Sequence, residues 1–371
     1  MKFSEELLRH ITENNLINIL TELRNKRVGI WGIGKAGKMI YASLKRNDII
    51  CSYFVDSNPQ YTGTECCGIT VCSKESIQKD DVIVVAANVR YGIHEELKKM
   101  GIHYVYIDPL SLLFYDKEDP YYVKNEITKH LCEIDEVYSM LLDPVSKKVY
   151  YNVLLHRAIH DISLIWEVYD ENQYWGNRII KNASGNFVDC GAYRGDTLTQ
   201  FMTQIGTRQY KYMAFEADKD NFASLTNLYK TNKWNVEAYN LGVWNNRDTL
   251  YFQNDVVSEA CVGGKVVENQ EDRTIKVIAD SLDHVLFGEK VDFIKMDIEG
   301  AEIKALQGAQ KIIKTQKPIL AISAYHELNH LWEVPLMIKE MNEGYKIYFA
   351  HHMWNMADTV CYGIESADNE V

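Results

Sequence analysis

The chain has 371 residues, 46% hydrophobic and 25% charged, so it is long enough for two domains with substantial cores. Its formal net charge of -12 argues against a nucleic-acid or anionic-membrane partner held by bulk electrostatics, while leaving room for a local basic pocket. No stretch approaches about 18 uninterrupted apolar residues, so no membrane span is expected.

The cysteines and the first residues predict a cytoplasmic protein. Eight cysteines are scattered along the chain without C-x-x-C spacing, which predicts neither a zinc site nor a disulfide framework. The opening residues M-K-F-S-E-E-L-L-R-H lack the apolar core of a signal peptide.

A Rossmann-like domain is predicted for residues 1–115. After a helical stretch over 5–23, the buried strand 27–31 leads into a G-x-G-x-x-G made of Gly32, Gly34 and Gly37. A second strand ends in Asp56, about 20 residues further on, where a dinucleotide fold places its ribose-binding acid.

Two interpretations of this glycine motif stay open. Residues 25 to 110 resemble the small nucleotide-binding-like domain found beside sugar-modifying enzymes, with D-S-N-P at 56–59 followed by a glycine-rich loop. That resemblance implies a nucleotide or nucleotide-sugar ligand at Gly32, Gly34, Gly37 and Asp56. The alternative is that the glycines only allow close packing of helix on strand.

Residues 116–182 are expected to form a helical connector, because they lack strand alternation and carry apolar side chains at helical spacing.

Residues 183–371 are predicted to form a second α/β domain. Strands at 187–190, 212–215, 291–296 and 319–323 are each followed by polar residues, and two late segments form a closing antiparallel pair. Ligands of a doubly wound sheet lie at the carboxyl ends of its strands. We therefore expect Asp189, Glu216, Asp297 and His326 to share one edge.

The stretch N-F-V-D-C-G-A-Y-R-G-D-T at 186–197 reads as a strand, a tight glycine turn and a helix start. Glycines let the backbone approach a ligand, and a helix N-terminus offers free N–H groups, so a nucleotide-like cofactor is expected. Glu216 at the end of the next strand suits a ribose diol. Asp218 is either part of that site or a cap on the following helix.

Four motifs together resemble the FkbM family of S-adenosylmethionine-dependent methyltransferases. They are V-D-C-G-A-Y-R-G-D-T at 188–197, F-E-A-D at 215–218, D-S-L-D at 280–283 and D-I-E-G-A-E at 297–302. The resemblance covers roughly residues 185 to 365 and implies a class I methyltransferase fold. It also implies O-methylation of a sugar, polysaccharide, lipo-oligosaccharide or macrolide hydroxyl.

The resemblance also assigns roles to residues. It places Gly191 and Gly195 in the loop under the cofactor's amino-acid part, Asp189 beneath that loop, and Asp297 and Glu299 between cofactor and acceptor. The full expected cofactor site is Asp189, Gly191, Tyr193, Gly195, Asp196, Thr197, Glu216, Ala217, Asp218, Gly242, Val243 and Asp297.

Methyl transfer to a hydroxyl requires an in-line acceptor and removal of its proton. The expected catalytic residues are Asp297, Glu299 and His326, acting through a general base (His326 or Asp297) or through Mg2+ held by carboxylates that include Glu302. The alternatives are that Glu299 and Glu302 are first-turn helix acids and that His326 is an ordinary loop residue.

Two other functions compete with this one. The first domain alone could run an NAD(P)-dependent oxidoreductase or epimerase, although no Tyr-x-x-x-Lys pair is suitably placed. It could instead be a nucleotide-sugar-binding or self-association module, which would make the protein a homo-oligomer. The expected substrate is a small molecule or glycan, with specificity in the connector and in a loop at 256–273.

Overall fold

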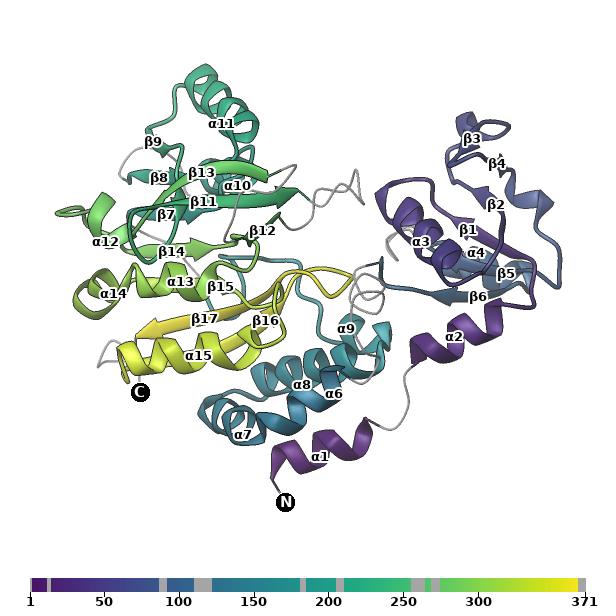
Figure 1. Ribbon diagram of the computed structural model, residues 1–371, viewed down its shortest axis with the longest axis horizontal. Helices are drawn as coiled ribbons and strands as arrows, with labels where there is room; N and C mark the ends of the chain where they lie inside the picture. Colours follow the sequence, from purple (N-terminus) through teal and green to yellow (C-terminus); the bar gives the residue numbers. More distant parts are fainter. Residues whose placement is uncertain are drawn as a thin grey trace.

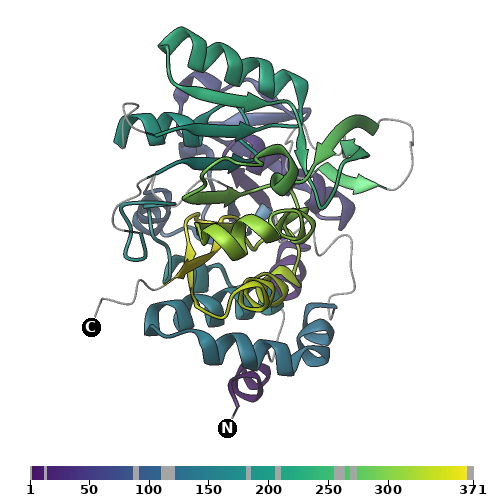
Figure 2. The ribbon, with the colours of Figure 1, turned by 90° about the vertical axis from the view of Figure 1, so that its left-hand side faces the viewer.

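The computed structural model describes residues 2–11, 15–86, 92–109, 122–180, 185–204, 210–254, 264–267 and 274–365. Figure 1 shows two α/β units side by side, one built on strands β1–β6 and the other on β7–β9 with β14–β17. A layer of helices, α6 to α9, lies along the lower side of the second unit, and Figure 2 shows the same layer after a quarter turn. The prediction of an α/β fold with two Rossmann-like sheets is confirmed.

The first sheet has six strands in the order β3-β4-β2-β1-β5-β6. All pairs are parallel except β3 with β4. Its strands are β1 (Val28–Trp31), β2 (Cys51–Val55), β3 (Glu65–Cys66), β4 (Ile69–Cys72), β5 (Val82–Val85) and β6 (His103–Tyr106), with helices α2 (Asn15–Leu23), α3 (Lys35–Arg46) and α4 (Ile93–Met100) and the short 3-10 turns η1 (Pro59–Tyr61) and η2 (Lys74–Ser76). The runs V-G-I-W and V-I-V-V are buried throughout, as strands covered on both faces by helices must be.

The connector is helical over most of residues 122–166, and its described residues 167–180 are turns and bends. Its helices are α6 (Tyr122–Lys129), α7 (Leu131–Met140), α8 (Pro144–Ile159) and α9 (Ile162–Trp166). Helix α8 begins at a proline, and the Asp143 side chain caps it by accepting from Ser146 N at 2.8 Å.

The first helix, α1 (Phe3–His10), packs on this connector and not on the first sheet. The Phe3 ring stacks on Tyr138 at 3.7 Å, and Ser4 donates through both its N and its Oγ to Asp135 at 2.8 Å. The domain limits 1–115, 116–182 and 183–371 stay predictions. The structure adds that α1 is spatially part of the helical layer.

The second sheet has seven strands in the order β16-β17-β15-β14-β7-β8-β9. Its strands are β7 (Phe187–Cys190), β8 (Tyr212–Phe215), β9 (Val236–Tyr239), β14 (Phe293–Met296), β15 (Ile319–Ser323), β16 (Tyr345–His351) and β17 (Thr359–Glu365), with helices α10 (Asp196–Gln204), α11 (Lys219–Asn232), α12 (Leu282–Val285), α13 (Glu302–Gln307), α14 (Gln310–Gln316) and α15 (His330–Met341). Strand β17 runs antiparallel to both β15 and β16, so the predicted reversed C-terminal pair is confirmed.

A third, four-stranded sheet lies beside the second, in the order β10-β13-β11-β12. Its strands are β10 (Gly242–Val243), β11 (Asp248–Asn254), β12 (Gly264–Val267) and β13 (Thr274–Asp280). The expected loop at 256–273 is wrong over Gly264–Val267, which pairs with β11, while 256–263 and 268–273 lie outside the described residues. Gly242 and Val243, two of the expected cofactor residues, form the short strand β10, which pairs in parallel with β13.

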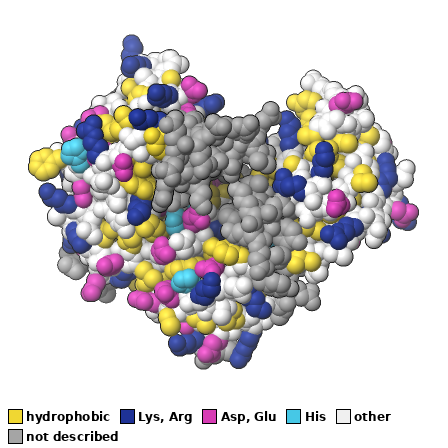
Figure 3. Space-filling model, in the orientation of Figure 1, with side chains coloured by type: hydrophobic (Ala, Val, Ile, Leu, Met, Phe, Trp, Pro, Cys, Tyr) yellow, Lys and Arg dark blue, Asp and Glu magenta, His cyan; other side chains and the backbone are white. Residues whose placement is uncertain are grey.

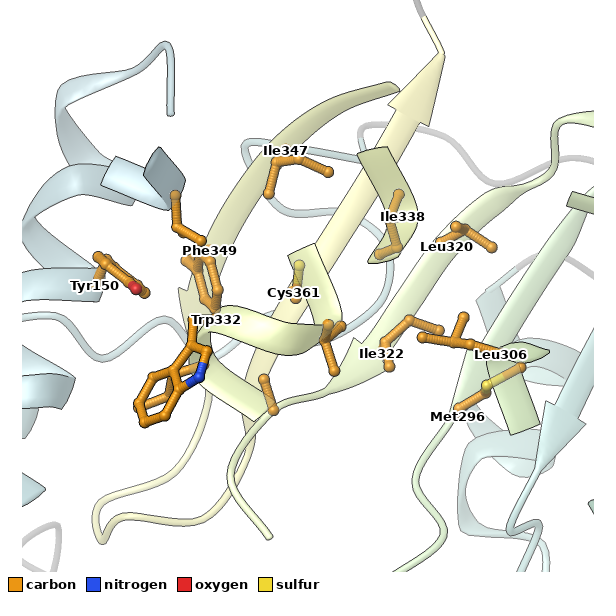
Figure 4. Close-up of a cluster of buried hydrophobic side chains, with 14 of the residues drawn as sticks. Tyr150, Met296, Leu306, Leu320, Ile322, Trp332, Ile338, Ile347, Phe349 and Cys361 are labelled. Atoms are coloured by element: carbon orange, nitrogen blue, oxygen red, sulfur yellow. The ribbon is translucent and has the colours of Figure 1, made fainter. Parts of the chain in front are cut away.

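The largest hydrophobic core joins the second sheet to the connector (Figure 4). Tyr150 of α8 packs against Phe349 of β16 with ring centroids 5.1 Å apart, while Trp332 of α15 lies beside Phe349 and Ile338 of the same helix lies nearer Leu320. Each such fully buried side chain stabilises the fold by about 1.5–3 kcal/mol relative to its exposed state. The connector is therefore held against the second sheet by packing in this core.

The first unit contacts the second near the turn between β16 and β17. The buried Asp108 accepts from Met356 N at 2.7 Å, and the Tyr106 ring meets the edge of Trp166 at 4.6 Å. Acidic and basic side chains are interspersed over the described part of the face in Figure 3. Among the described helices, none is both long enough and apolar enough to cross a bilayer.

Candidate active site

Four predicted residues lie where the strands of the second sheet end. Asp189 is in β7, Glu216 follows β8, Asp297 follows β14 and His326 follows β15. These four strands run parallel, so their carboxyl ends meet at one edge, as the sequence predicted.

The glycine turn after β7 is pressed against the turn after β14. Gly191 N and Ala192 N both donate to Phe215 O at 3.0 Å, and Asp297 N donates to Cys190 O at 3.0 Å. Gly191 has φ +80°, and a Cβ there would lie 2.0 Å from the Asp297 carbonyl oxygen. Only glycine permits this approach.

Glu216 lies directly beneath that turn. Its Oε2 accepts from Tyr193 N at 2.8 Å and its Oε1 accepts from Asp218 N at 2.7 Å, and the residue is only 8% exposed. Burial raises its pKa to about 7, although the two N–H groups oppose that rise. Each carboxylate oxygen keeps a lone pair free to accept from a ribose hydroxyl.

The other expected cofactor residues surround Glu216 and the turn. Tyr193 is half exposed at φ +47°, and Asp196 and Thr197 begin α10. Asp218 caps α11 by accepting from Asp220 N and Asn221 N, so the capping interpretation is confirmed. A Cβ on Gly242 would lie 3.9 Å from the Ala217 Cβ, and Val243 follows it in β10.

Asp189 is fully buried and ion-paired. Its Oδ1 lies 2.8 Å from Lys295 Nζ, and its Oδ2 accepts from the Tyr212 hydroxyl at 2.5 Å. Lys295 Nζ also donates to Gly191 O at 2.8 Å, which fastens the glycine turn to β14. Burial alone would lower the pKa of Lys295, but the charges of Asp189 and Asp297 outweigh it and hold the pKa above its usual range.

Lys295 is a site residue that the sequence analysis missed. The signal was a single charged residue inside the otherwise apolar strand F-I-K-M, one position before its end. A lysine almost never occurs fully buried without a partner. A buried partner at the same edge of the sheet could have been inferred from that.

His326 is surrounded by carboxylates of the D-I-E-G-A-E segment. Its Nδ1 lies 2.9 Å from Glu302 Oε1, while its Nε2 lies 3.5 Å from Asp297 Oδ1 and 3.4 Å from Glu299 Oε2. The Tyr325 hydroxyl donates to Asp297 Oδ1 at 3.1 Å. The three predicted catalytic residues Asp297, Glu299 and His326 are thus brought together.

The charges in this cluster shift the pKa values of His326 and of the nearby Asp358. Burial alone would lower the pKa of His326, but Glu302, then Asp297 and Glu299, outweigh it and raise the pKa to about 9. Burial, and then the charge of Asp297, raises the pKa of Asp358 to about 7. Removing charge from any one member therefore changes the others.

A cavity of about 380 Å³ opens beside the cluster, between the connector and α15. Glu327 lines it, and a Cβ added at Gly300 would lie 3.6 Å from the Glu327 side chain, so the cavity wall touches the D-I-E-G turn. The remaining lining residues are aromatic, acidic, basic or apolar: Tyr122, Val123, Glu126, His130, Arg157, His160, Leu328, Asn329, Trp332, Glu333 and Met356.

In the first unit, Gly37 of the glycine motif packs closely on Gly32, while the space at Gly34 is open. A Cβ on Gly37 would lie 1.9 Å from Gly32 O, and Gly34 is the N-cap of α3. Asp56 Oδ2 accepts from Ile33 N at 3.2 Å, and its Oδ1 accepts from Asn58 N at 2.9 Å. These contacts support the packing interpretation, while nucleotide binding at these residues stays a prediction.

Comparison with known proteins identifies two segments of the chain. Residues 189–355 match the family model of the methyltransferase FkbM domain, and residues 24–107 match the C2185-like, N-terminal model. No curated protein matches the chain.

Among solved structures, the crystal structure of the FkbM methyltransferase from Methylobacillus flagellatus KT has a similar fold. At 19% identity it covers 97% of this chain and 98% of its own, with a TM-score of 0.72. Aeropyrum pernix fibrillarin in complex with S-adenosyl-L-methionine covers 48% of this chain and 66% of its own, at 9% identity and a TM-score of 0.31. The precorrin-6y C5,15-methyltransferase from Geobacter metallireducens GS-15 covers 50% and 82%, at 12% identity and a TM-score of 0.30.

The family match spans the glycine turn, Glu216 and the D-I-E-G-A-E segment, which are the residues the fold brings to one edge. Residues 189–355 therefore belong to the FkbM family, and the chain is an S-adenosylmethionine-dependent methyltransferase.

Proposed function

We propose that this methyltransferase acts on a hydroxyl of a sugar, polysaccharide or related glycan precursor. The observation that carries the proposal is the juxtaposition of two features: the Asp297, Glu299 and His326 cluster and the cavity lined by the exposed Tyr122 and by Glu327. Aromatic faces with carboxylates beside them suit polyhydroxylated ligands, because the faces stack on C–H surfaces and the carboxylates accept from hydroxyls.

Residues at the carboxyl ends of β7 and β8 and in β10 would bind S-adenosylmethionine. Glu216 would hold the ribose hydroxyls, and the glycine turn from Gly191 to Gly195 would carry the amino-acid part. Bound there, S-adenosylmethionine would supply a methyl group on a sulfonium, which is a good leaving group. Gly242 and Val243, which form the short strand β10 next to Ala217, would flank the adenine.

The acceptor hydroxyl would lie against Asp297, Glu299 and His326. These residues would hold its oxygen in line with the methyl group and accept its hydrogen bond while the proton is lost. Glu302 is fully buried and bonded to His326, so it would orient the imidazole without touching the acceptor.

The first test is calorimetric titration of the full chain with S-adenosylhomocysteine. We expect binding by the wild type, at least tenfold weaker binding by Glu216→Ala, and no change in Glu340→Ala, an exposed acid on α15 that serves as a control. Absence of binding to the wild type would contradict the cofactor assignment.

The second test follows labelled methyl groups from S-adenosylmethionine to a panel of free sugars, nucleotide-sugars and oligosaccharides. Transfer to a hydroxyl, with Glu327→Gln raising KM for the acceptor but leaving S-adenosylhomocysteine affinity unchanged, would support the acceptor assignment. Transfer confined to amines or carbon atoms would reject it.

A further inference from the structure

Asp358 lies at the same edge of the second sheet as Asp297, although it belongs to none of the four sequence motifs. Strand β17 runs antiparallel to β15, so its first residues lie where the parallel strands end. Ala324 N donates to Thr359 O at 2.8 Å, and His352 N donates to Asp358 O at 3.0 Å. These bonds hold Asp358 beside the end of β15, at φ +60°, a conformation that aspartate and asparagine tolerate better than other residues with a side chain.

The charges around Asp358 show that its carboxyl group is close to the turns of the candidate site. Burial and then the charge of Asp297 raise its pKa to about 7, while His326 and Lys295 oppose that rise and Asp196 adds to it. Lys295 is bonded to the glycine turn, and Asp196 directly follows that turn. Within the described residues, no N–H or O–H group donates a hydrogen bond to the Asp358 carboxyl group.

The Tyr174 hydroxyl is a second polar group at this place that has no hydrogen-bond partner among the described residues. Tyr174 is only 3% exposed, and its backbone N donates to the Tyr362 hydroxyl at 3.3 Å. Burial, and then the charges of Asp297 and Asp358, raise its pKa well above the usual range, so its hydroxyl lies near both carboxyl groups. A buried hydroxyl without a partner points to a ligand group in front of it.

The described carboxylates at this edge outnumber the cations. Lys295 is already paired with Asp189, and His326, whose pKa is about 9, is a cation near neutral pH that is flanked by carboxylates of the D-I-E-G-A-E segment. No described side chain forms an ion pair with Asp358. A cationic ligand group would therefore be more favourable in front of Asp358 than a neutral or anionic one.

The chemistry of S-adenosylmethionine indicates which cationic group this is. The sulfonium joins the ribose to the amino-acid part, so in the proposed placement it lies between Glu216 and the glycine turn, with its methyl group directed at the Asp297 cluster. The glycine turn touches that cluster, since a Cβ on Gly191 would lie 2.0 Å from the Asp297 carbonyl oxygen. Asp358 and Tyr174 both respond to the charge of Asp297 or act on it, and so lie on the methyl side of the sulfonium.

We propose that the Asp358 carboxylate and the Tyr174 hydroxyl face the sulfonium of S-adenosylmethionine and make the site select this cation over the uncharged sulfur of S-adenosylhomocysteine. The proposal rests on the cofactor placement given under the proposed function, and not on the acceptor. When the methyl group leaves, sulfur keeps the electron pair of the broken C–S bond and loses its positive charge, so the attraction to Asp358 ends. The two residues would therefore favour exchange of product for substrate.

The experiment is calorimetric titration of the full chain at pH 8 with S-adenosylmethionine and S-adenosylhomocysteine. The wild type should bind the first about tenfold more tightly, and Asp358→Asn should remove most of that ratio while leaving the affinity for S-adenosylhomocysteine within about threefold. Asparagine is chosen because it tolerates a positive φ. Asp48→Asn is the matched control, since Asp48 has φ +58° but is exposed in the first unit.

Two further titrations separate charge from shape. Sinefungin carries an amine at the position of the sulfonium methyl group, and should follow S-adenosylmethionine in both the wild type and Asp358→Asn. Tyr174→Phe should lower the ratio by about threefold, the size of one C–H···O contact to the methyl group. Tyr150→Phe is its control, because the Tyr150 hydroxyl is also buried without a partner but lies in the hydrophobic core.

The pH dependence of the wild-type ratio needs no variant. A cation beside Asp358 favours its ionised form, so the ratio should rise between pH 6 and pH 8 and then stay constant. The titration of Glu216 acts equally on both ligands, which share the ribose, and cancels. The pKa values of His326, Lys295 and the neighbouring tyrosines are raised above this range. The titratable groups facing Asp358 are Asp297, His326, Lys295, Asp196, Tyr174, Tyr325 and Tyr362.

Equal weakening of both ligands by Asp358→Asn would assign the carboxylate to a group they share, such as the α-ammonium, and would overturn the proposal. An unchanged ratio in that variant, or sinefungin bound as weakly as S-adenosylhomocysteine, would overturn it too. If Asp358→Asn does not fold, the pH dependence of the wild-type ratio decides alone. Absence of binding of both ligands to the wild type would overturn the cofactor placement as well, whereas the sugar panel tests the acceptor separately.

Discussion

Glu216 is buried beneath the glycine turn with both oxygens already accepting from backbone N–H groups. Burial, the largest effect, and the nearby Asp218 and Asp189 raise its pKa to about 7, so in the free protein the group changes charge near neutral pH. A ribose diol donates best to the ionised form. The proposed cofactor site therefore contains its own titrating group.

This predicts that S-adenosylhomocysteine affinity depends on pH. Below pH 7 the protonated carboxyl must lose its proton before it binds, so affinity should fall by up to about tenfold per pH unit, and above pH 8 it should be constant. Calorimetry at pH 6, 7 and 8 measures this. Glu216→Gln should bind weakly at every pH with a flat profile, while an equally steep profile in that variant would reject Glu216 as the titrating group.

Gly191 offers a second prediction at the scale of one residue. Gly191→Ala should destabilise the protein by about 2–4 kcal/mol and abolish cofactor binding, because the added Cβ would collide with the Asp297 carbonyl. Gly63→Ala is the matched control: it has a similar φ of +84° but no atom within 4 Å of its Cβ. Equal shifts in the urea midpoint for both variants would mean that backbone conformation alone, and not the contact with Asp297, explains the cost.

Sequence patterns predicted the positions of these residues along the strands but not their side-chain partners. Asp189, Glu216, Asp297 and His326 follow apolar runs, and parallel strands bring such positions to one edge. The Glu302–His326 and Asp189–Lys295 pairs join different elements, so no local spacing reveals them. Glu302 is an acid of the first turn of α13, as one sequence interpretation has it, but its pairing with His326 could not be read from the sequence.

At the scale of elements, the Asp189–Lys295 pair joins β7 to β14 in the middle of the second sheet. Both side chains are nearly or fully buried, so the cost of removing them from water is offset only by each other and by their hydrogen bonds. Lys295→Met should therefore destabilise the protein by about 3–5 kcal/mol, since it leaves the Asp189 charge buried without its cation.

Two further variants test this explanation by urea unfolding. Adding Asp189→Asn to Lys295→Met should restore much of the lost stability, because it removes the uncompensated charge. Lys290→Met removes an exposed lysine, paired with Asp292 just before β14, and should cost less than about 1 kcal/mol. A double variant no more stable than the single one would show that packing, and not charge, accounts for the loss.

The mixed sheet of β10 to β13 was the element least visible in the sequence. Its strands β11 and β13 pair across an intervening segment, so their partnership depends on a long-range contact. Helix α1 shows the same limit of sequence patterns. Its apolar stripe correctly predicted a helix, but the stripe alone does not reveal whether the helix packs on the first sheet or on the connector. Periodicity identifies a buried face, and tertiary contacts decide what buries it.

At the scale of the whole molecule, the first unit and the connector converge on two segments of the active-site edge. Asp108, just beyond β6, accepts from Met356 N in the turn between β16 and β17. Arg157 of α8 donates to Tyr325 O beside His326 and contacts Met356 Sδ. The same turn ends at Asp358, whose pKa responds to Asp297. The position of the first unit is thereby coupled to the loops that carry the catalytic cluster.

This coupling predicts an effect at a distance from the first unit. Asp108→Ala removes a buried acceptor from Met356 N–H, which should cost about 1–3 kcal/mol and loosen the turn between β16 and β17. Hydrogen exchange at residues 352–358 should become at least tenfold faster, because this turn would open locally without global unfolding. Methyl transfer should slow, while S-adenosylhomocysteine affinity should stay near that of the wild type, because the proposed cofactor site lies in the opposite half of the sheet edge. Asp80→Ala, an exposed acid of the same unit, is the control. Unchanged exchange at these residues in Asp108→Ala would mean that the connector alone holds the turn, and that the first unit serves another purpose.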